Sequence, residues 1–217
     1  MATAPEPTAA PASAGNDDRT KERGNSGPVA ELDVAKLHAL PSEQQDLYLL
    51  TYTSDLVQYV SGLSKGDIST VQADLKRELF KVLNLSSPAI TRVIRTNLGK
   101  CFAAIVGKGD RILLYDTVND LLAIVGAGKT TDLKTKFAAA HILGEIYTTA
   151  GENAASQSTT TIAALLKLLK AASNHAGLRG SILAAIRKVI AGTSQPIDEP
   201  TARDVWKQAR NMATGDK

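Results

Sequence analysis

The sequence is poor in the residues that build disulfides and metal sites. Cys101 is its single cysteine, so no intrachain disulfide can form, and we expect this thiol to pack as a small apolar residue in a reducing compartment. The three histidines, His38, His141 and His175, lie in separate segments with no second type of metal ligand near them. We therefore expect no metal and no cofactor, and we expect His141 to be a packed or partly exposed residue of a helix.

Aromatic residues make up only 4% of the chain, whereas 43% of it is hydrophobic. Alanine, leucine and isoleucine supply most of that apolar content, which suits closely packed helices better than a β-sandwich. No segment alternates polar and apolar residues with the period of a strand. The sequence therefore predicts an all-α fold.

Long apolar runs and a secretory signal are both missing. Every apolar run is shorter than the ~20 residues that a membrane helix needs, and no basic stretch followed by an apolar segment opens the chain. We therefore expect a soluble, cytosolic protein. The net charge of +3 is small, and basic residues alternate with acidic ones along the expected helices, which favours a solvated surface over nucleic acid binding.

Residues 1–30 are rich in alanine, proline, serine and glycine and then in charged residues. They hold no bulky apolar side chain between Met1 and Val29, so burial cannot offset the entropy cost of ordering them. We expect a disordered tail over residues 1–30 and a helical domain over residues 31–217.

From about Asp33 the chain becomes a series of amphipathic segments with short polar breaks. Ser42 followed by Gln45 has the spacing of a capping box. Ser87 before Pro88 resembles an N-cap with proline at the first helical position. These signals predict eight helices, over residues 41–62, 67–85, from 87 onward, 111–125, 133–149, 160–172, 178–191 and from 199 onward.

Three of these helices share an internal repeat. Arg95, Lys136 and Arg179 serve as matching origins, which are 41 and then 43 residues apart. Small or apolar residues follow each origin at offsets of 3, 6, 7 and 10, all on one helical face. The matched sets are Leu98/Ala139/Ile182, Cys101/Ile142/Ala185, Phe102/Leu143/Ile186 and Ile105/Ile146/Val189. A period in the low forties with two helices per unit is the spacing of HEAT and armadillo repeats, so we predict an α-solenoid of about four helix hairpins.

Residues 123–130, Ala-Ile-Val-Gly-Ala-Gly-Lys-Thr, resemble a phosphate-binding loop with alanine in place of the first glycine. Such a loop follows a buried strand and works with a second strand that ends in aspartate. The residues before this loop have a helical pattern instead, and no later strand ends in aspartate. We therefore interpret Gly126 and Gly128 as the end of a helix, with Lys129 beside its last carbonyl groups. Nucleotide binding by this loop, with Thr130 as the hydroxyl residue, is kept as an alternative.

No arrangement of catalytic residues stands out. No serine lies in a nucleophile elbow, and Cys101 has no histidine at a readable spacing. Asp198 and Glu199 come at a helix start, where capping explains their negative charge. Trp206 is expected in the core between the last two helices, or as an anchor for a partner if the array ends there. We expect a protein that is not an enzyme and has no catalytic residue.

Several short motifs follow one another between about Ser86 and Arg210. They are residues 86–92 (SSPAITR), 135–139 (TKFAA) with 144–147 (GEIY), 165–170 (LLKLLK), 182–190 (ILAAIRKVI) and 205–211 (VWKQARN). In this order and with these gaps, the chain resembles the N-terminal HEAT region of the large clathrin-adaptor accessory family. The animal members of that family are called HEAT repeat-containing protein five.

The resemblance implies a scaffold that associates with adaptor protein complex 1 and its accessory proteins and helps to sort cargo between the trans-Golgi network and endosomes. It implies peripheral rather than integral membrane association, no catalytic residues, and a full protein many times longer than 217 residues. A helical-repeat module of another pathway is an alternative that the sequence leaves open. So is self-association, because the last helix lacks a clear polar capping surface.

Overall fold

The computed structural model describes Met1 and residues 30–128, 131–172 and 175–215. Within these residues it contains nine α-helices, one short 3-10 helix and no strand, which confirms the all-α fold. The predicted disordered tail over residues 1–30 falls almost wholly outside the described part of the chain.

The helices follow one another with short connections. They are α1 (Val34–Ala39), α2 (Ser42–Gly62), α3 (Lys65–Leu83), α4 (Arg92–Lys108), α5 (Arg111–Gly126), α6 (Leu133–Ala150), the 3-10 helix η1 (Ala155–Gln157), α7 (Ser158–Ala171), α8 (Ala176–Thr193) and α9 (Glu199–Thr214). None of the helices in the described residues is long and apolar enough to span a membrane.

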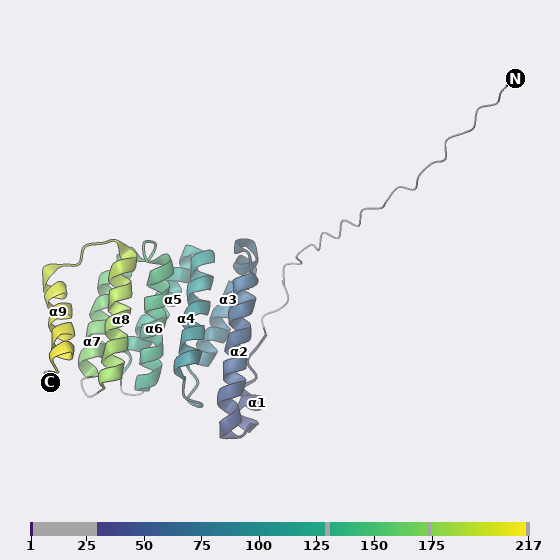
Figure 1. The fold of residues 1–217 in the computed structure, drawn as a ribbon, viewed down its shortest axis with the longest axis horizontal. Coiled ribbons are helices and arrows are strands. Elements are labelled where there is room, and N and C mark those ends of the chain that lie inside the picture. The colour runs from purple at the N-terminus through teal and green to yellow at the C-terminus, as the bar shows by residue number, and fades with distance from the viewer. Residues whose placement is uncertain (2–29, 129–130, 173–174, 216–217) are drawn as a thin grey trace.

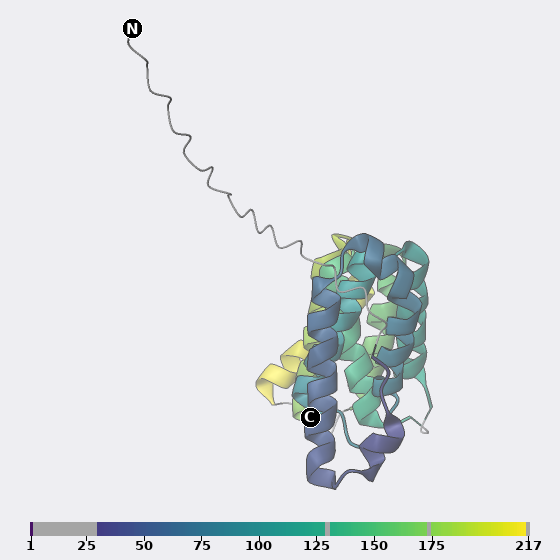
Figure 2. The same cartoon turned by 90° about the vertical axis from the view of Figure 1, so that its right-hand side faces the viewer.

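The helices form two layers. Helices α2, α4, α6 and α8 lie side by side in a first row, each packed on the next, and α3, α5 and α7 form a second row behind it (Figure 1). The view along the rows in Figure 2 shows the two layers edge-on. Across the layers, α3 packs on α4, α5 on α6, and α7 on α8, so each second-row helix contacts the first-row helix that follows it. The core lies between the rows.

The repeat predicted from the sequence coincides with this first row. Its three members are α4, α6 and α8, which are neighbours (Figure 1). All residues at the matched offsets are at most 3% exposed, including the small ones Cys101, Ala139 and Ala185. The shared register therefore marks the faces that the three helices bury.

Glycines allow α6 and α8 to approach closely. A Cβ atom on Gly192 of α8 would lie 2.0 Å from the carbonyl oxygen of Tyr147 in α6. A Cβ on Gly144 of α6 would lie 3.1 Å from the Cα of Ala185 in α8. Gly192 thus has no room for a side chain and Gly144 has very little, so small residues set the spacing between these two helices.

The capping box predicted at the start of α2 is wrong, although the helix itself begins within one residue of its predicted position. Ser42 is the first residue of α2 rather than its N-cap, and Gln45 donates its amide to the carbonyl of Leu40 instead of closing a capping box. A true capping box lies one helix later, between Ser64 and Asp67 at the start of α3. Sequence spacing alone did not separate them, because Asp67 has a shorter side chain than the Glu or Gln of the usual pattern.

The start of α4 is displaced from its predicted position. Ser87 and Pro88 are joined by a cis peptide bond and belong to the connection that precedes the helix. Thr91 is the N-cap, and its hydroxyl accepts a hydrogen bond from the amide of Ile94. Thr91 has an extended backbone and lies closer than Ser87 to Ile94, the first buried residue of the helix, so it provides the better cap.

A short segment before the helices packs across α2 and α3 and was not expected from the sequence. Leu32 is buried, and its amide donates a hydrogen bond of 2.8 Å to Glu78, whose side chain is fully buried. The hydroxyl of Tyr52 donates to the carbonyl of Ala30, and Lys81 forms an ion pair with Glu78. The segment after Leu32 then forms the six-residue helix α1.

The position of Trp206 contradicts the expectation that it lies in the core. Its side chain is 70% exposed, and no residue of α9 is buried. The reason is the direction of α9: it packs chiefly on α8 and projects outward on the side of the first row (Figure 2). A salt bridge between Lys170 of α7 and Asp204 provides a further contact, at the surface.

Candidate protein-binding surface

The loop that resembles a phosphate-binding loop follows a helix. The residues that would have to form its strand are the last turns of α5, and Gly126 ends that helix, as predicted. Lys129 and Thr130 lie outside the described residues. Lys136 of α6 donates to the carbonyl oxygens of Ala127 and Gly128, at 2.6 and 2.9 Å. A lysine from the next helix thus neutralises this helix end, and the described residues before the loop form α5 instead of the strand that a nucleotide site requires.

The remaining residues singled out in the sequence are structural or isolated. Cys101 is buried, and burial raises the pKa of its thiol to about 12. His38 lies 3.1 Å from the carbonyl oxygen of Ser87, and His175 is exposed at the start of α8. Asp198 caps α9 by accepting from the amide of Thr201, as predicted. The described residues contain no cluster of histidine, cysteine and acidic side chains that could hold a metal ion.

Charge is segregated in the first row, contrary to the expectation that acidic and basic residues alternate along the helices. Helices α4, α6 and α8 together contain nine lysines and arginines but a single acidic residue, Glu145. The nine are Arg92, Arg95, Lys100, Lys108, Lys134, Lys136, Arg179, Arg187 and Lys188. Helix α2, at the end of the row, has three acids and no basic residue. The small net charge of the whole chain conceals this asymmetry.

Three of these cations serve the fold. Lys108 donates to the carbonyl oxygen of Leu63 at 2.7 Å, just past the end of α2, and Lys136 does the same past the end of α5. Lys188 of α8 pairs with Glu145 of α6. Neighbouring hairpins are therefore joined by hydrogen bonds from lysine to main-chain carbonyl oxygens and by one ion pair.

A cluster of positive charge surrounds His141 in the middle of the row. The side chain of His141 is partly buried and lies 3.5 Å from Glu145. Burial lowers its pKa below the ordinary value, and the charges of Arg95, Lys188 and Arg92 lower it further, against the opposing effect of Glu145. The imidazole is therefore neutral at pH 7, and the local potential is positive.

Eight of the nine cations of the row have no acidic partner among the described residues. Apart from Lys108, Lys136 and Arg179, they are Arg92, Arg95, Lys100, Lys134 and Arg187. Of these last five, all except Arg95 are exposed. Because each first-row helix contacts the second row and its neighbours on its other sides, its exposed side chains point outward from the row. We call these five residues the cationic face.

Arg95 differs from the other residues of the cationic face because its side chain is partly removed from water. It is half-buried, and both this burial and the charge of Arg92 lower its pKa. A guanidinium that is partly removed from water without a counter-ion gains when an anion approaches. An anion close to the cationic face is therefore stabilised electrostatically.

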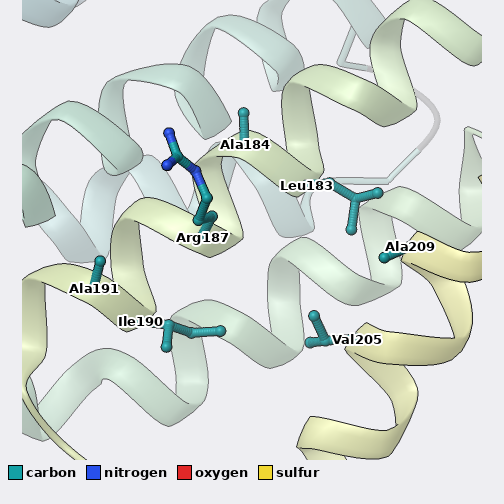
Figure 3. A pocket seen from close by; sticks show the side chains of 7 residues that line it. All are labelled: Leu183, Ala184, Arg187, Ile190, Ala191, Val205 and Ala209. Atoms are coloured by element: carbon teal, nitrogen blue, oxygen red, sulfur yellow. The ribbon is translucent and has the colours of Figure 1, made fainter. Parts of the chain in front are cut away.

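A groove opens where α9 leaves α8 (Figure 3). It measures about 490 Å³, within the size range of ordinary ligand sites. Its lining is apolar except for one charged side chain, Arg187. The lining residues are Leu183, Ala184, Arg187, Ile190 and Ala191 of α8 with Val205 and Ala209 of α9. Arg187 thus belongs both to the groove and to the cationic face.

Sequence reasoning found neither surface. Counting acids separately in each expected helix would have revealed the cationic face, because residues 92–108 and 176–193 contain none. The groove depends on the angle of α9 to α8, for which the sequence gives no signal.

Comparison with known proteins gives a partial match. The chain is 25% identical over 142 residues to Protein SWEETIE of Arabidopsis thaliana, which covers 65% of this chain and 6% of SWEETIE. The chain thus spans a small fraction of the length of that relative. No protein-family model matches the chain, and no solved structure matches it.

Proposed function

We propose that this chain is a protein-binding scaffold of the HEAT/armadillo type, an α-solenoid of four helix pairs. The observation that supports this most is the repeat register of α4, α6 and α8, whose matched residues are all buried in one row of neighbouring helices. Proteins of this type stack hairpins that cannot bury their apolar faces alone, and they bind partners along an extended surface. The cationic face supplies such a surface here. That the chain is not an enzyme stays a prediction.

We further propose that the scaffold acts in clathrin-adaptor traffic between the trans-Golgi network and endosomes. The support for this step is the succession of motifs between residues 86 and 211 that resembles the adaptor accessory family. The expected partner is adaptor protein complex 1 with its accessory proteins. In this proposal the chain itself is a cytosolic protein that associates peripherally with the membrane. A helical-repeat module of another pathway is the alternative.

Affinity purification of the tagged full chain from its source cells tests both steps. The binding variant is Arg92→Glu/Lys100→Glu/Lys134→Glu, which reverses three exposed cations of α4 and α6. The matched control is Lys65→Glu/Arg111→Glu/Lys167→Glu, which makes the same change in charge at exposed positions of the second row. Circular dichroism checks that both variants keep the helical content of the parent chain.

We expect the parent and the control to recover the same partners, including adaptor subunits, and the binding variant to recover roughly tenfold less, because reversing surface charges turns attraction into repulsion. Recovery should also fall as salt is raised, since exposed charges are screened. Equal recovery by both variants would remove the cationic face from the proposal. Recovery of other complexes without adaptor subunits would refute adaptor traffic in favour of the alternative pathway.

A further inference from the structure

The groove between α8 and α9 differs from the rest of the cationic face because it combines an apolar recess with one charge. Leu183 and Ile190 line one wall and Val205 lines the other, with the exposed Arg187 beside them (Figure 3). Arg187 has no acidic partner among the described residues. A ligand that fits this groove needs an apolar group for the recess and an anion for the guanidinium.

We infer that the α8/α9 groove binds a short segment of a partner protein in which a bulky apolar side chain stands next to acidic residues. This inference rests on the proposed scaffold function and names the chemistry of one partner segment. The apolar side chain enters between Leu183, Ile190 and Val205, and a neighbouring carboxylate pairs with Arg187. Acidic residues further along the segment meet the positive charge of α8, which contains three basic residues and no acid.

Charge argues against a second copy that would pair through the same groove. Helix α8 has three basic residues and no acid, and α9 has three basic residues and two acids. The corresponding surface of another copy would therefore bring like charges together, which opposes pairing through this groove.

The distribution of exposed apolar residues argues against a lipid bilayer. Among the described residues after Met1, the large exposed apolar side chains are Leu47, Val93, Ile112 and Trp206, which lie on four different helices. None of them lines the groove. An interfacial helix that inserts into a membrane instead gathers such residues on one face. A recessed apolar groove fits a side chain that projects from a peptide.

The peptides used to probe the groove come from a random peptide display library that is selected for binding to the full chain. The enriched peptides are then synthesised with a fluorescent label, and their affinities are measured by fluorescence anisotropy. Two variants alter the groove. Ala184→Glu places a larger, negatively charged side chain at an exposed lining position, and Arg187→Glu reverses the charge at the groove. The matched control is Arg111→Glu, which makes the same substitution as Arg187→Glu at an exposed position of α5 in the second row.

We expect enriched peptides that share a bulky apolar residue next to aspartate or glutamate. Arg187→Glu should weaken their binding by about tenfold, and Ala184→Glu should weaken it at least as much. The control Arg111→Glu should weaken it by no more than about twofold. Replacing the apolar residue of a peptide by serine, or its acids by lysine, should abolish binding.

Several results would overturn the inference. Enriched peptides without acids, or peptides that bind the two groove variants as well as the parent chain, would show that the groove does not select this chemistry. Binding to phosphatidylserine vesicles that Ala184→Glu abolishes would identify a lipid surface as the occupant. A dimer in sedimentation velocity that Ala184→Glu dissociates would identify a second copy. If partners are recovered from cells equally by the parent and Arg187→Glu, the inference fails while the scaffold proposal stands.

Discussion

At the scale of single residues, Glu78 is the side chain with the clearest structural task. It is fully buried, and it accepts hydrogen bonds from the amide of Leu32 at 2.8 Å and from Lys81 at 2.8 Å. Burial by itself raises the pKa of this carboxyl. The hydrogen bonds from Lys81, Leu32 and Tyr52, together with the charge of Lys81, outweigh it and hold the pKa below the ordinary 4.5. The ionised carboxylate therefore ties the segment around Leu32 to α3.

The lowered pKa predicts how stability depends on pH. A carboxyl whose pKa is lower in the folded state stabilises it fully above the unfolded pKa, near 4.5, and loses this contribution as the pH falls through the folded value. Glu78→Gln should lower the free energy of unfolding at pH 7 by about 1.5–3 kcal/mol, the usual value of hydrogen bonds to a charged group. It should also flatten the acid limb of the stability curve.

Urea unfolding followed by circular dichroism, from pH 7 to below pH 4.5, measures both effects. Glu43→Gln, at an exposed glutamate of α2, is the control and should leave the curve of the parent chain unchanged. An acid limb in Glu78→Gln as steep as that of the parent would contradict the role assigned to Glu78.

At the scale of helices, the contact between α6 and α8 depends on a missing side chain. A Cβ on Gly192 would lie 2.0 Å from the carbonyl oxygen of Tyr147, which is main chain and cannot turn away. Gly192→Ala should therefore push the helices apart and cost about 1–3 kcal/mol. Gly177→Ala, in the same helix, meets nothing within 4 Å and should stabilise by about 0.5–1 kcal/mol, because glycine disfavours helix.

Thermal and urea unfolding of the two variants measure the difference. Both replace glycine by alanine in α8, so their effects on helix propensity are alike and only the contact with α6 differs. The prediction fails if the two variants change stability in the same direction.

At the scale of the whole molecule, the depth of burial differs strongly along the rows. Helix α6 lies between α4 and α8 in the first row and buries residues along most of its length. Helix α9 buries none and packs chiefly on α8. We therefore predict that amide hydrogen exchange, measured by mass spectrometry, is slowest in α6 and fastest in α9 among the helices from α2 onward. Equal protection of α6 and α9 would show that α9 is held more firmly than its contacts indicate.

The sequence by itself determined the class of fold and the repeat. Apolar residues recur every helical turn, so the positions after Arg95, Lys136 and Arg179 marked the buried faces of α4, α6 and α8 before any contact was known. Helix starts were less well predicted, since Ser42, Ser87 and Ser64 offer similar local signals and packing selects among them.

Only the tertiary structure decided where the surfaces lie. The residues of the cationic face that belong to different helices are at least 34 residues apart along the chain, and they form one face because the second-row helices occupy the opposite side. Likewise, α9 has an amphipathic sequence that predicted a buried Trp206, yet its angle to α8 leaves that side chain in solvent and opens the groove beside Arg187. Periodicity states which face of a helix is apolar, but the neighbours that cover the face are set by contacts between distant segments.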